Sequence, residues 1–417
     1  MTISWKKNTS PNLILDQLQN SKIKNSDGSI KFEAFNYDIF TTILFNILDF
    51  PTDISEVDAR SMISAGIRNI ELSKRITKDN ILKELNLLER KYRASPLKRY
   101  VLVSSISLNR SIIINRIYLD RNIVVIENNL TNRFISDNWE KLIKKASTSI
   151  YADLPKDYSY VRVHVSSQSI YDAANQALDS IDFIRGIWNW VINKTFTYRK
   201  TFIGSLNPIN KLILGPIHTI HNIEGELLTN NEWWYEPSYL GAIKTYNPNP
   251  NDLNILIKSQ TNIRKAINRI QYSKDLRSTL IRYTRALDER DMTSSYIKLW
   301  GILEFLTDTH HGSSHNVTVK RIASLYEDQN YNSQVLRILK EYRNSYVHSG
   351  NETNEIETYL VRLKNYVDTM LHFHITNKFH FKSIENAAEF LDLPASEHEL
   401  IYKMKLYKYA KTFRHLN

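Results

Sequence analysis

Residues 333–350 read SQVLRILKEYRNSYVHSG, and this stretch decides the fold of the last third of the chain. Its apolar side chains recur at three- and four-residue spacing, as one buried face of a helix requires: Val335, Leu339, Tyr342 and Tyr346. We predict a helix that begins near Ser333 and runs to His348. It should stop at Ser349-Gly350, because a glycine just past a helix readily adopts the left-handed conformation that ends it.

Two more stripes of the same kind lie on either side of this helix. They are Tyr296, Trp300, Leu303 and Thr307 upstream, and Ile356, Leu360, Leu363, Val367 and Met370 downstream. Short connections between amphipathic helices make neighbours antiparallel, and a bundle buries all three stripes together. We therefore predict an all-α helical bundle over residues 251–376.

The first part of the chain has a different pattern. Residues 12–93 are mainly of helical period, whereas short β-branched runs follow at 101–103, 112–114 and 123–126. An alternating strand at 160–165 leads into an amphipathic helix, and more strand-like pieces, whose pairing the sequence does not assign, lie at 212–214 and 217–220.

These patterns give an α+β fold class, with an N-terminal mixed α/β region over residues 1–245. Tyr246-Asn247-Pro248-Asn249-Pro250 is a proline-broken linker and the predicted boundary before the bundle. Residues 377–417 form a predicted helical tail that ends basic: Lys403, Lys405, Lys408, Lys411 and Arg414. This tail is interpreted as a solvated helix face, with an RNA-binding arm as the alternative.

Composition excludes several kinds of chemistry. The chain has 417 residues and no cysteine, which rules out disulfides, thiolate zinc sites and cysteine nucleophiles. No export signal or membrane-spanning apolar run is seen, so we expect a cytoplasmic protein that does not enter membranes. The net charge of +11 would attract nucleic acid, although a lysine- and asparagine-rich composition can also reflect an AT-rich genome.

The residues with chemical potential lie at the end of the helix quoted first. His348 falls at its C-terminus, where unpaired carbonyl groups stabilise a protonated imidazole, as an acid-base catalyst requires. Asn344 is four residues upstream and shares a face with His348, whereas Arg343 is rotated from His348 by roughly 140° around the helix axis.

This run resembles the RxxxxH motif of HEPN domains. Residues 343–350 are similar to the longer form RN-x-x-x-H-x-G. Upstream, Leu299-Trp300-Gly301-Ile302-Leu303-Glu304-Phe305-Leu306 resembles the W-x-x-L-E-x-L helix of ApeA-like HEPN proteins. The resemblance covers about residues 255–375, and a bare arginine-to-histidine spacing would be much weaker evidence.

The resemblance implies an endoribonuclease that needs no metal and no cofactor and acts as a homodimer or higher homo-oligomer. The arginine and histidine of two protomers would face each other across the interface. His348 would act as acid or base, Arg343 would stabilise phosphoryl charge, and Asn344 would orient His348 or a phosphate. Glu304 is expected to hold Arg343 through a bidentate ion pair.

Other interpretations remain open. Arg343 could form only a surface salt bridge and His348 only cap a helix, leaving a non-catalytic HEPN-type protein that binds RNA or a partner and dimerises. As an enzyme, the chain would be an antiphage effector of abortive infection, with a phage-derived or nucleic-acid trigger sensed by residues 1–245. We interpret the histidine-rich stretch His310-His311-Gly312-Ser313-Ser314-His315 as a polar loop rather than a metal site. His372 and His374 are interpreted as structural histidines. The aromatic cluster Trp233-Trp234-Tyr235 is interpreted as part of the core rather than as a base-stacking surface.

Overall fold

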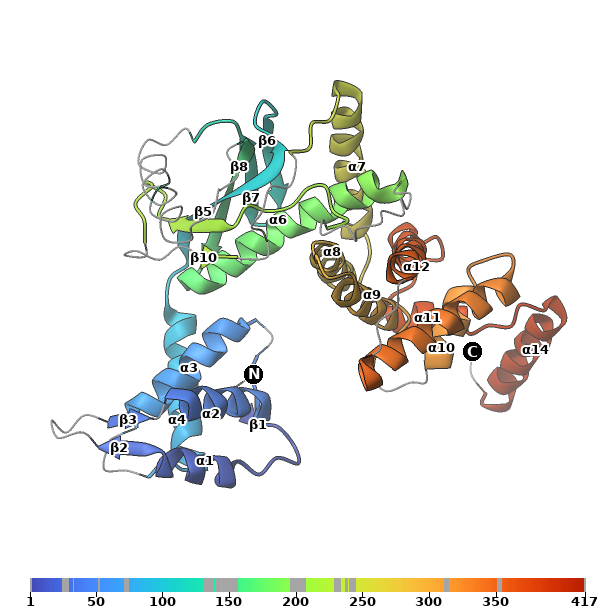
Figure 1. Cartoon of the computed structure of the whole chain (residues 1–417). Coiled ribbons are helices and arrows are strands. Elements are labelled where there is room, and N and C mark those ends of the chain that lie inside the picture. Colours follow the sequence, from blue (N-terminus) through green and yellow to red (C-terminus); the bar gives the residue numbers. More distant parts are fainter. Residues whose placement is uncertain are drawn as a thin grey trace.

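The computed structural model describes residues 2–24, 30–32, 34–51, 53–70, 75–130, 139, 144, 157–195, 208–228, 234–236, 239, 245–310, 315–350 and 355–415. The fold is α+β, as the sequence predicts: a helical N-terminal unit, a twisted antiparallel sheet and a C-terminal helical region follow one another along the chain (Figure 1).

The N-terminal unit has its own hydrophobic core. Helices α1 (Pro11–Asn20), α2 (Ala34–Ile47), α3 (Glu56–Asn69) and α4 (Lys78–Ala94) contribute to it. Ser55 caps α3 by accepting from the Asp58 backbone N–H, and Thr77 and Asn80 form a capping box that starts α4. The mainly helical pattern is therefore confirmed. Two short antiparallel pairs were not predicted: β1 (Ser4–Trp5) with β4 (Leu48–Asp49), and β2 (Lys22–Lys24) with β3 (Ile30–Phe32).

Within the part of the chain that the structure describes, the central sheet has six antiparallel strands in the order β10-β9-β5-β8-β7-β6. They are β5 (Lys98–Asn109), β6 (Ile114–Leu119), β7 (Asn122–Glu127), β8 (Tyr158–Ser167), β9 (Ile217–His221) and β10 (Trp234–Tyr235). Leu102 of β5 lies opposite Val163 of β8 and Ile220 of β9. The predicted piece at 212–214 is not a strand, since Leu214 makes only a single bridge, to Ile106.

Helix α6 (Ile170–Ile192) joins the sheet to the helical region. It packs on β8 and β5 on one side and on α7 (Pro250–Asn268) and α8 (Ser273–Leu287) on the other. One continuous core therefore runs from the sheet through α6 into the bundle. The predicted linker ends where Asn249 caps α7, but Tyr246 exchanges backbone hydrogen bonds with Ser107 and Asn109 of β5. Hydrophobic packing thus crosses the predicted boundary.

The bundle continues with α9 (Met292–Leu306), α10 (His315–Ala323), α11 (Gln329–Ser349) and α12 (Ile356–Thr376). The three predicted stripes lie on α9, α11 and α12 and face the bundle core, to which α7, α8 and α10 also contribute buried side chains. A short 3-10 turn (Asn193–Thr195) follows α6. None of the helices in the described ranges is long and apolar enough to traverse a bilayer.

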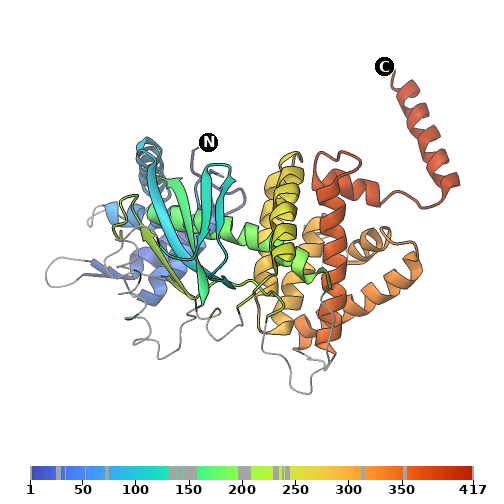
Figure 2. The ribbon, with the colours of Figure 1, turned by 90° about the horizontal axis from the view of Figure 1, so that it is seen from above.

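The C-terminal tail contains α13 (Ile384–Leu391), which packs on the bundle, and α14 (Glu397–Phe413). Helix α14 extends away from the body and buries none of its side chains (Figure 2). Its exposed surface mixes the predicted cations with large apolar side chains, namely Ile401, Tyr402, Met404, Leu406, Tyr407, Tyr409 and Phe413. It is therefore more apolar than an ordinary solvated helix.

His374 of α12 gives a pH-dependent contribution to stability. Burial lowers its pKa to about 4, so the folded protein holds it neutral while the unfolded chain binds a proton below about pH 6.5. Its contribution is therefore complete above pH 6.5 and is lost as the pH falls towards 4, by about 1.4 kcal/mol per pH unit. His374→Gln removes this titrating group. In urea unfolding we therefore expect the free energy of unfolding of the wild type, relative to that of the variant, to fall by about 2 kcal/mol from pH 7 to pH 5. A difference independent of pH would contradict this.

Candidate functional site

The predicted site lies on the last turns of α11. The helix ends at Ser349, and Gly350 follows with φ 65° and ψ 15°, so the predicted glycine stop is confirmed. The Gly350 N–H donates to the Tyr346 carbonyl oxygen. His348 is exposed one residue before the end of the helix, close to carbonyl groups that no further helical turn can satisfy.

Arg343 and Asn344 are half-buried one turn earlier. Arg343 Nη1 donates to Asn344 Oδ1 over 3.2 Å. Within the described ranges Arg343 forms no ion pair, so the alternative of a surface salt bridge is not supported. Its guanidinium therefore keeps donor capacity for an anionic ligand. Arg343 and His348 are five positions apart in sequence, a rise of about 7.5 Å along the helix.

Aromatic contacts fix the orientation of α11 relative to its neighbours. Tyr296 of α9 donates through its hydroxyl to the Leu339 carbonyl oxygen over 2.6 Å, and its ring meets Tyr342 edge-on at 5.1 Å. Tyr342 also contacts Tyr359 of α12, with ring centroids 5.4 Å apart. Because Tyr342 immediately precedes Arg343, the contacts that bury one side of α11 turn the site residues toward solvent.

The predicted ion pair between Glu304 and Arg343 is not formed. Glu304 Oε1 accepts a hydrogen bond from Trp300 Nε1 over 2.8 Å, while the hydrogen bond described for Arg343 goes to Asn344. Trp300 and Glu304 are four residues apart on α9, so the indole reaches the carboxylate within a single helix. Glu304 therefore orders the buried Trp300 side chain and does not position Arg343 by direct pairing.

More positive charge lies on the same side of α11. Arg337, Lys340, Asn344 and His348 follow each other at spacings of three and four residues, which places them in a row along one side of the helix. Arg337 is exposed, and Lys340 Nζ donates to Asn316 Oδ1 over 3.0 Å. A phosphodiester chain lying along this row would meet cations before reaching His348.

The other histidine and aromatic motifs have different outcomes. The interpretation of His374 as structural is confirmed, because Nε2 donates to the Leu306 carbonyl oxygen over 2.9 Å and Nδ1 accepts from Tyr272 at 3.1 Å. Residues 311–314 lie outside the described ranges, and among described residues no three potential ligands gather to hold a metal ion. Trp233 also lies outside the described ranges, whereas Trp234 and Tyr235 form β10.

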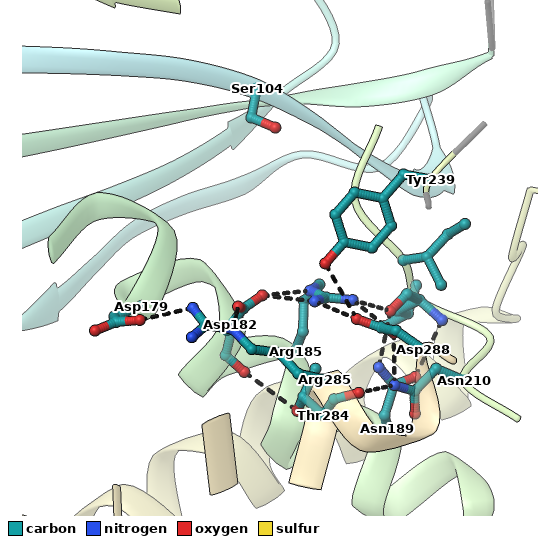
Figure 3. A network of polar contacts seen from close by, with 12 residues as sticks. Ser104, Asp179, Asp182, Arg185, Asn189, Asn210, Tyr239, Thr284, Arg285 and Asp288 are labelled. Atoms are coloured by element: carbon teal, nitrogen blue, oxygen red, sulfur yellow. Dashed lines mark hydrogen bonds and ion pairs between the residues drawn. The ribbon is translucent and has the colours of Figure 1, made fainter. Parts of the chain in front are cut away.

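Sequence reasoning missed a buried ionic cluster between α6 and α8 (Figure 3). Arg185 has no exposed surface, and its Nη2 pairs with Asp182 at 2.5 Å and with Asp288 at 2.8 Å. Burial opposes the positive charge of Arg185, but Asp288 and Asp182 outweigh it and raise its pKa well above the ordinary range. Arg285 reaches Asp182 from the outside, with 2.7 Å between Nε and Oδ2.

This cluster fastens the sheet region to the bundle. Arg185 Nη1 and Asn189 Nδ2 both donate to the Leu212 carbonyl oxygen, at 2.9 and 2.8 Å. Asn210 Nδ2 donates to Asp288 Oδ1 over 2.7 Å. The segment before β9 is thus held against α6 and the end of α8. The available signal was the set of polar residues that interrupts the apolar 181–192 window.

Comparisons of the chain with protein-family models, with curated proteins and with solved structures found no match.

Proposed function

We propose that this chain is an endoribonuclease that uses Arg343 and His348 to cleave RNA by attack of the ribose 2′-OH, without a catalytic metal. The observation that carries the proposal is the placement of both residues on the last turns of α11, with His348 exposed and Arg343 in no ion pair within the described ranges. Their side chains are available to an anionic substrate, and the sequence around them resembles the HEPN motif.

The proposed chemistry needs one base and one acid. A neutral imidazole removes the 2′-OH proton, the oxygen attacks phosphorus, and the bond to the 5′-oxygen breaks as an imidazolium protonates that leaving oxygen. Arg343 stabilises the charge on the phosphoryl oxygens, and its bond to Asn344 limits the directions in which it can point. Two copies of His348 from a homodimer would divide the roles of base and acid.

Charge outside the reacting groups also supports an RNA substrate. Arg337 and Lys340 precede the site along α11. The uncovered helix α14 and its C-cap residue Arg414 together carry five cations within residues 403–414, interleaved with exposed aromatic rings. Cations contact phosphates and aromatic rings stack on unpaired bases, which together favour single-stranded RNA. We place the enzyme in the cytoplasm as an antiphage effector of abortive infection whose trigger acts through residues 1–245.

The products test this reaction directly. The purified chain is incubated with a fluorescent single-stranded RNA and with the same sequence in DNA, with and without EDTA. We expect cleavage of RNA only, unaffected by EDTA, with 2′,3′-cyclic phosphate and 5′-hydroxyl ends, because the nucleophile belongs to the RNA. Cleavage of DNA, 5′-phosphate ends or loss of activity in EDTA would contradict the proposal. An intact RNA that is nevertheless bound would favour the non-catalytic alternative.

A further inference from the structure

A pocket of about 550 Å³ lies where the sheet, α6 and the α8–α9 connection meet, outside the candidate site on α11. Its wall includes the outer side of the buried ionic cluster, through Asp182, Arg285 and Asp288. Figure 3 shows Tyr239 pointing toward this cluster, and its hydroxyl lies 3.4 Å from Asp288. The volume is within the range of small-molecule sites.

His218 of β9 lines this pocket, and one of its ring nitrogens lacks a hydrogen-bond partner among the described residues. Its side chain is 1% exposed, Nδ1 lies 2.8 Å from the Ser104 hydroxyl, and Nε2 has no hydrogen-bond partner within the described ranges. The other two deeply buried histidines use both ring nitrogens: His221 with Thr219 and Gly225, and His374 with Tyr272 and Leu306. A buried ring nitrogen left unpaired is costly unless a molecule in the pocket binds it.

The charge of the wall indicates what that molecule is. The lining residues include five carboxylates and three fixed cations, the carboxylates being Asp182, Glu236, Asp288, Glu289 and Asp291. Arg185 and Asp179 lie outside the pocket and pair with lining residues, and their opposite charges cancel. Glu289 pairs with Lys298, whereas Glu236 and Asp291 have no ion pair with any described residue. Glu236 is exposed, and Asp291 caps α9 by accepting the Thr293 and Ser294 backbone N–H groups, so neither carboxylate has its charge neutralised by a described cation.

We propose that this pocket binds a small organic cation that carries an ammonium or guanidinium group. His218 Nε2 would accept a hydrogen bond from it, and Glu236 and Asp291 would balance its charge. The Ser104 hydroxyl oxygen can accept a hydrogen bond from Nδ1–H, and in that tautomer Nε2 is an acceptor. An organic cation fits better than a bare metal ion, because no three potential ligands gather here among the described residues.

Calorimetric titration of the full chain tests the proposal with three probes: agmatine, spermidine and 4-guanidinobutanoate. The last has the size of agmatine, but a carboxylate replaces its ammonium group. We expect agmatine or spermidine at millimolar concentration to bind and to raise the melting temperature, and 4-guanidinobutanoate to bind at least tenfold more weakly. Failure of both cations to bind, or equal binding of 4-guanidinobutanoate, would overturn the proposal.

Matched variants locate the site. In His218→Asn the amide group lies near the former position of Nδ1, and nothing replaces Nε2. In His218→Gln the amide group lies near the former position of Nε2. We therefore expect His218→Asn to weaken binding about tenfold and His218→Gln to recover most of it. Glu236→Gln should also weaken binding, and Glu327→Gln, an exposed charge change elsewhere, should not. Unchanged affinity in both His218→Asn and Glu236→Gln, each with a wild-type melting temperature without ligand, would refute the site. None of these outcomes depends on RNA cleavage.

Discussion

His348→Ala is expected to reduce the rate of RNA cleavage by about 10²–10⁴-fold while leaving RNA affinity within a few-fold of wild type. The imidazole would transfer protons in the reaction, but it contributes little to binding compared with the phosphate contacts of Arg337, Lys340 and Arg343. Because His348 is exposed, its truncation should not change the melting temperature. Single-turnover rates and filter binding on the same preparation separate the two effects.

His372→Ala is the matched control, since His372 is also an exposed histidine near the end of a bundle helix. It should cleave RNA at the wild-type rate. Arg343→Lys adds a second comparison, because lysine keeps the charge but loses the planar guanidinium that contacts two phosphoryl oxygens, and we expect a loss of at least tenfold. Equal cleavage by wild type and His348→Ala would refute catalysis by this residue and leave the RNA-binding alternative.

The bundle could be predicted because its signals are local. Each stripe on α9, α11 and α12 repeats with the helical period, and Gly350 ends α11 with the backbone geometry that only glycine adopts easily. The same locality places Arg343, Asn344 and His348 on one helix end. Whether a second copy completes the site depends on surfaces between molecules, which a periodic pattern does not encode.

The prediction for Glu304 failed for a physical reason. We expected a distant guanidinium to be its partner, but Trp300 lies one helical turn upstream and its indole N–H reaches the carboxylate without any tertiary contact. The motif spacing that resembles the HEPN helix therefore reflects, at least in part, an internal hydrogen bond of α9. Between competing partners, the one fixed by helix geometry loses less conformational freedom on pairing.

The buried cluster and the pocket were missed because their members are far apart in sequence. In the sequence, Asp182 and Arg185 only interrupt an apolar run, and Asp288 gives no signal at all. Their meeting depends on how α6 packs against α8, over about a hundred residues of separation. A charged pair at three-residue spacing inside an apolar helix is nevertheless a usable signal, since buried charges require partners.

Arg185→Met is expected to destabilise the fold by about 3–5 kcal/mol. Methionine fills a similar volume, so the loss arises mainly from leaving Asp182 and Asp288 as uncompensated buried carboxylates and from removing a donor to the Leu212 carbonyl oxygen. Unfolding in urea, followed by tryptophan fluorescence, measures this loss, and Trp188, which is buried in the same helix, is one of the seven tryptophans that contribute to the signal.

Two further variants distinguish the effect of leaving buried charges unpaired from the effect of replacing any paired arginine by methionine. Arg277→Met breaks the pair with the exposed Asp120 and should cost less than about 1 kcal/mol. Adding Asp182→Asn and Asp288→Asn to Arg185→Met removes the stranded charges, so the triple variant should be more stable than Arg185→Met alone, although it carries more substitutions. If Arg185→Met lost no more stability than Arg277→Met, the ionic cluster would not be what holds the sheet region against the bundle. The pocket wall formed by Asp182 and Asp288 would then have to be held by the surrounding apolar core.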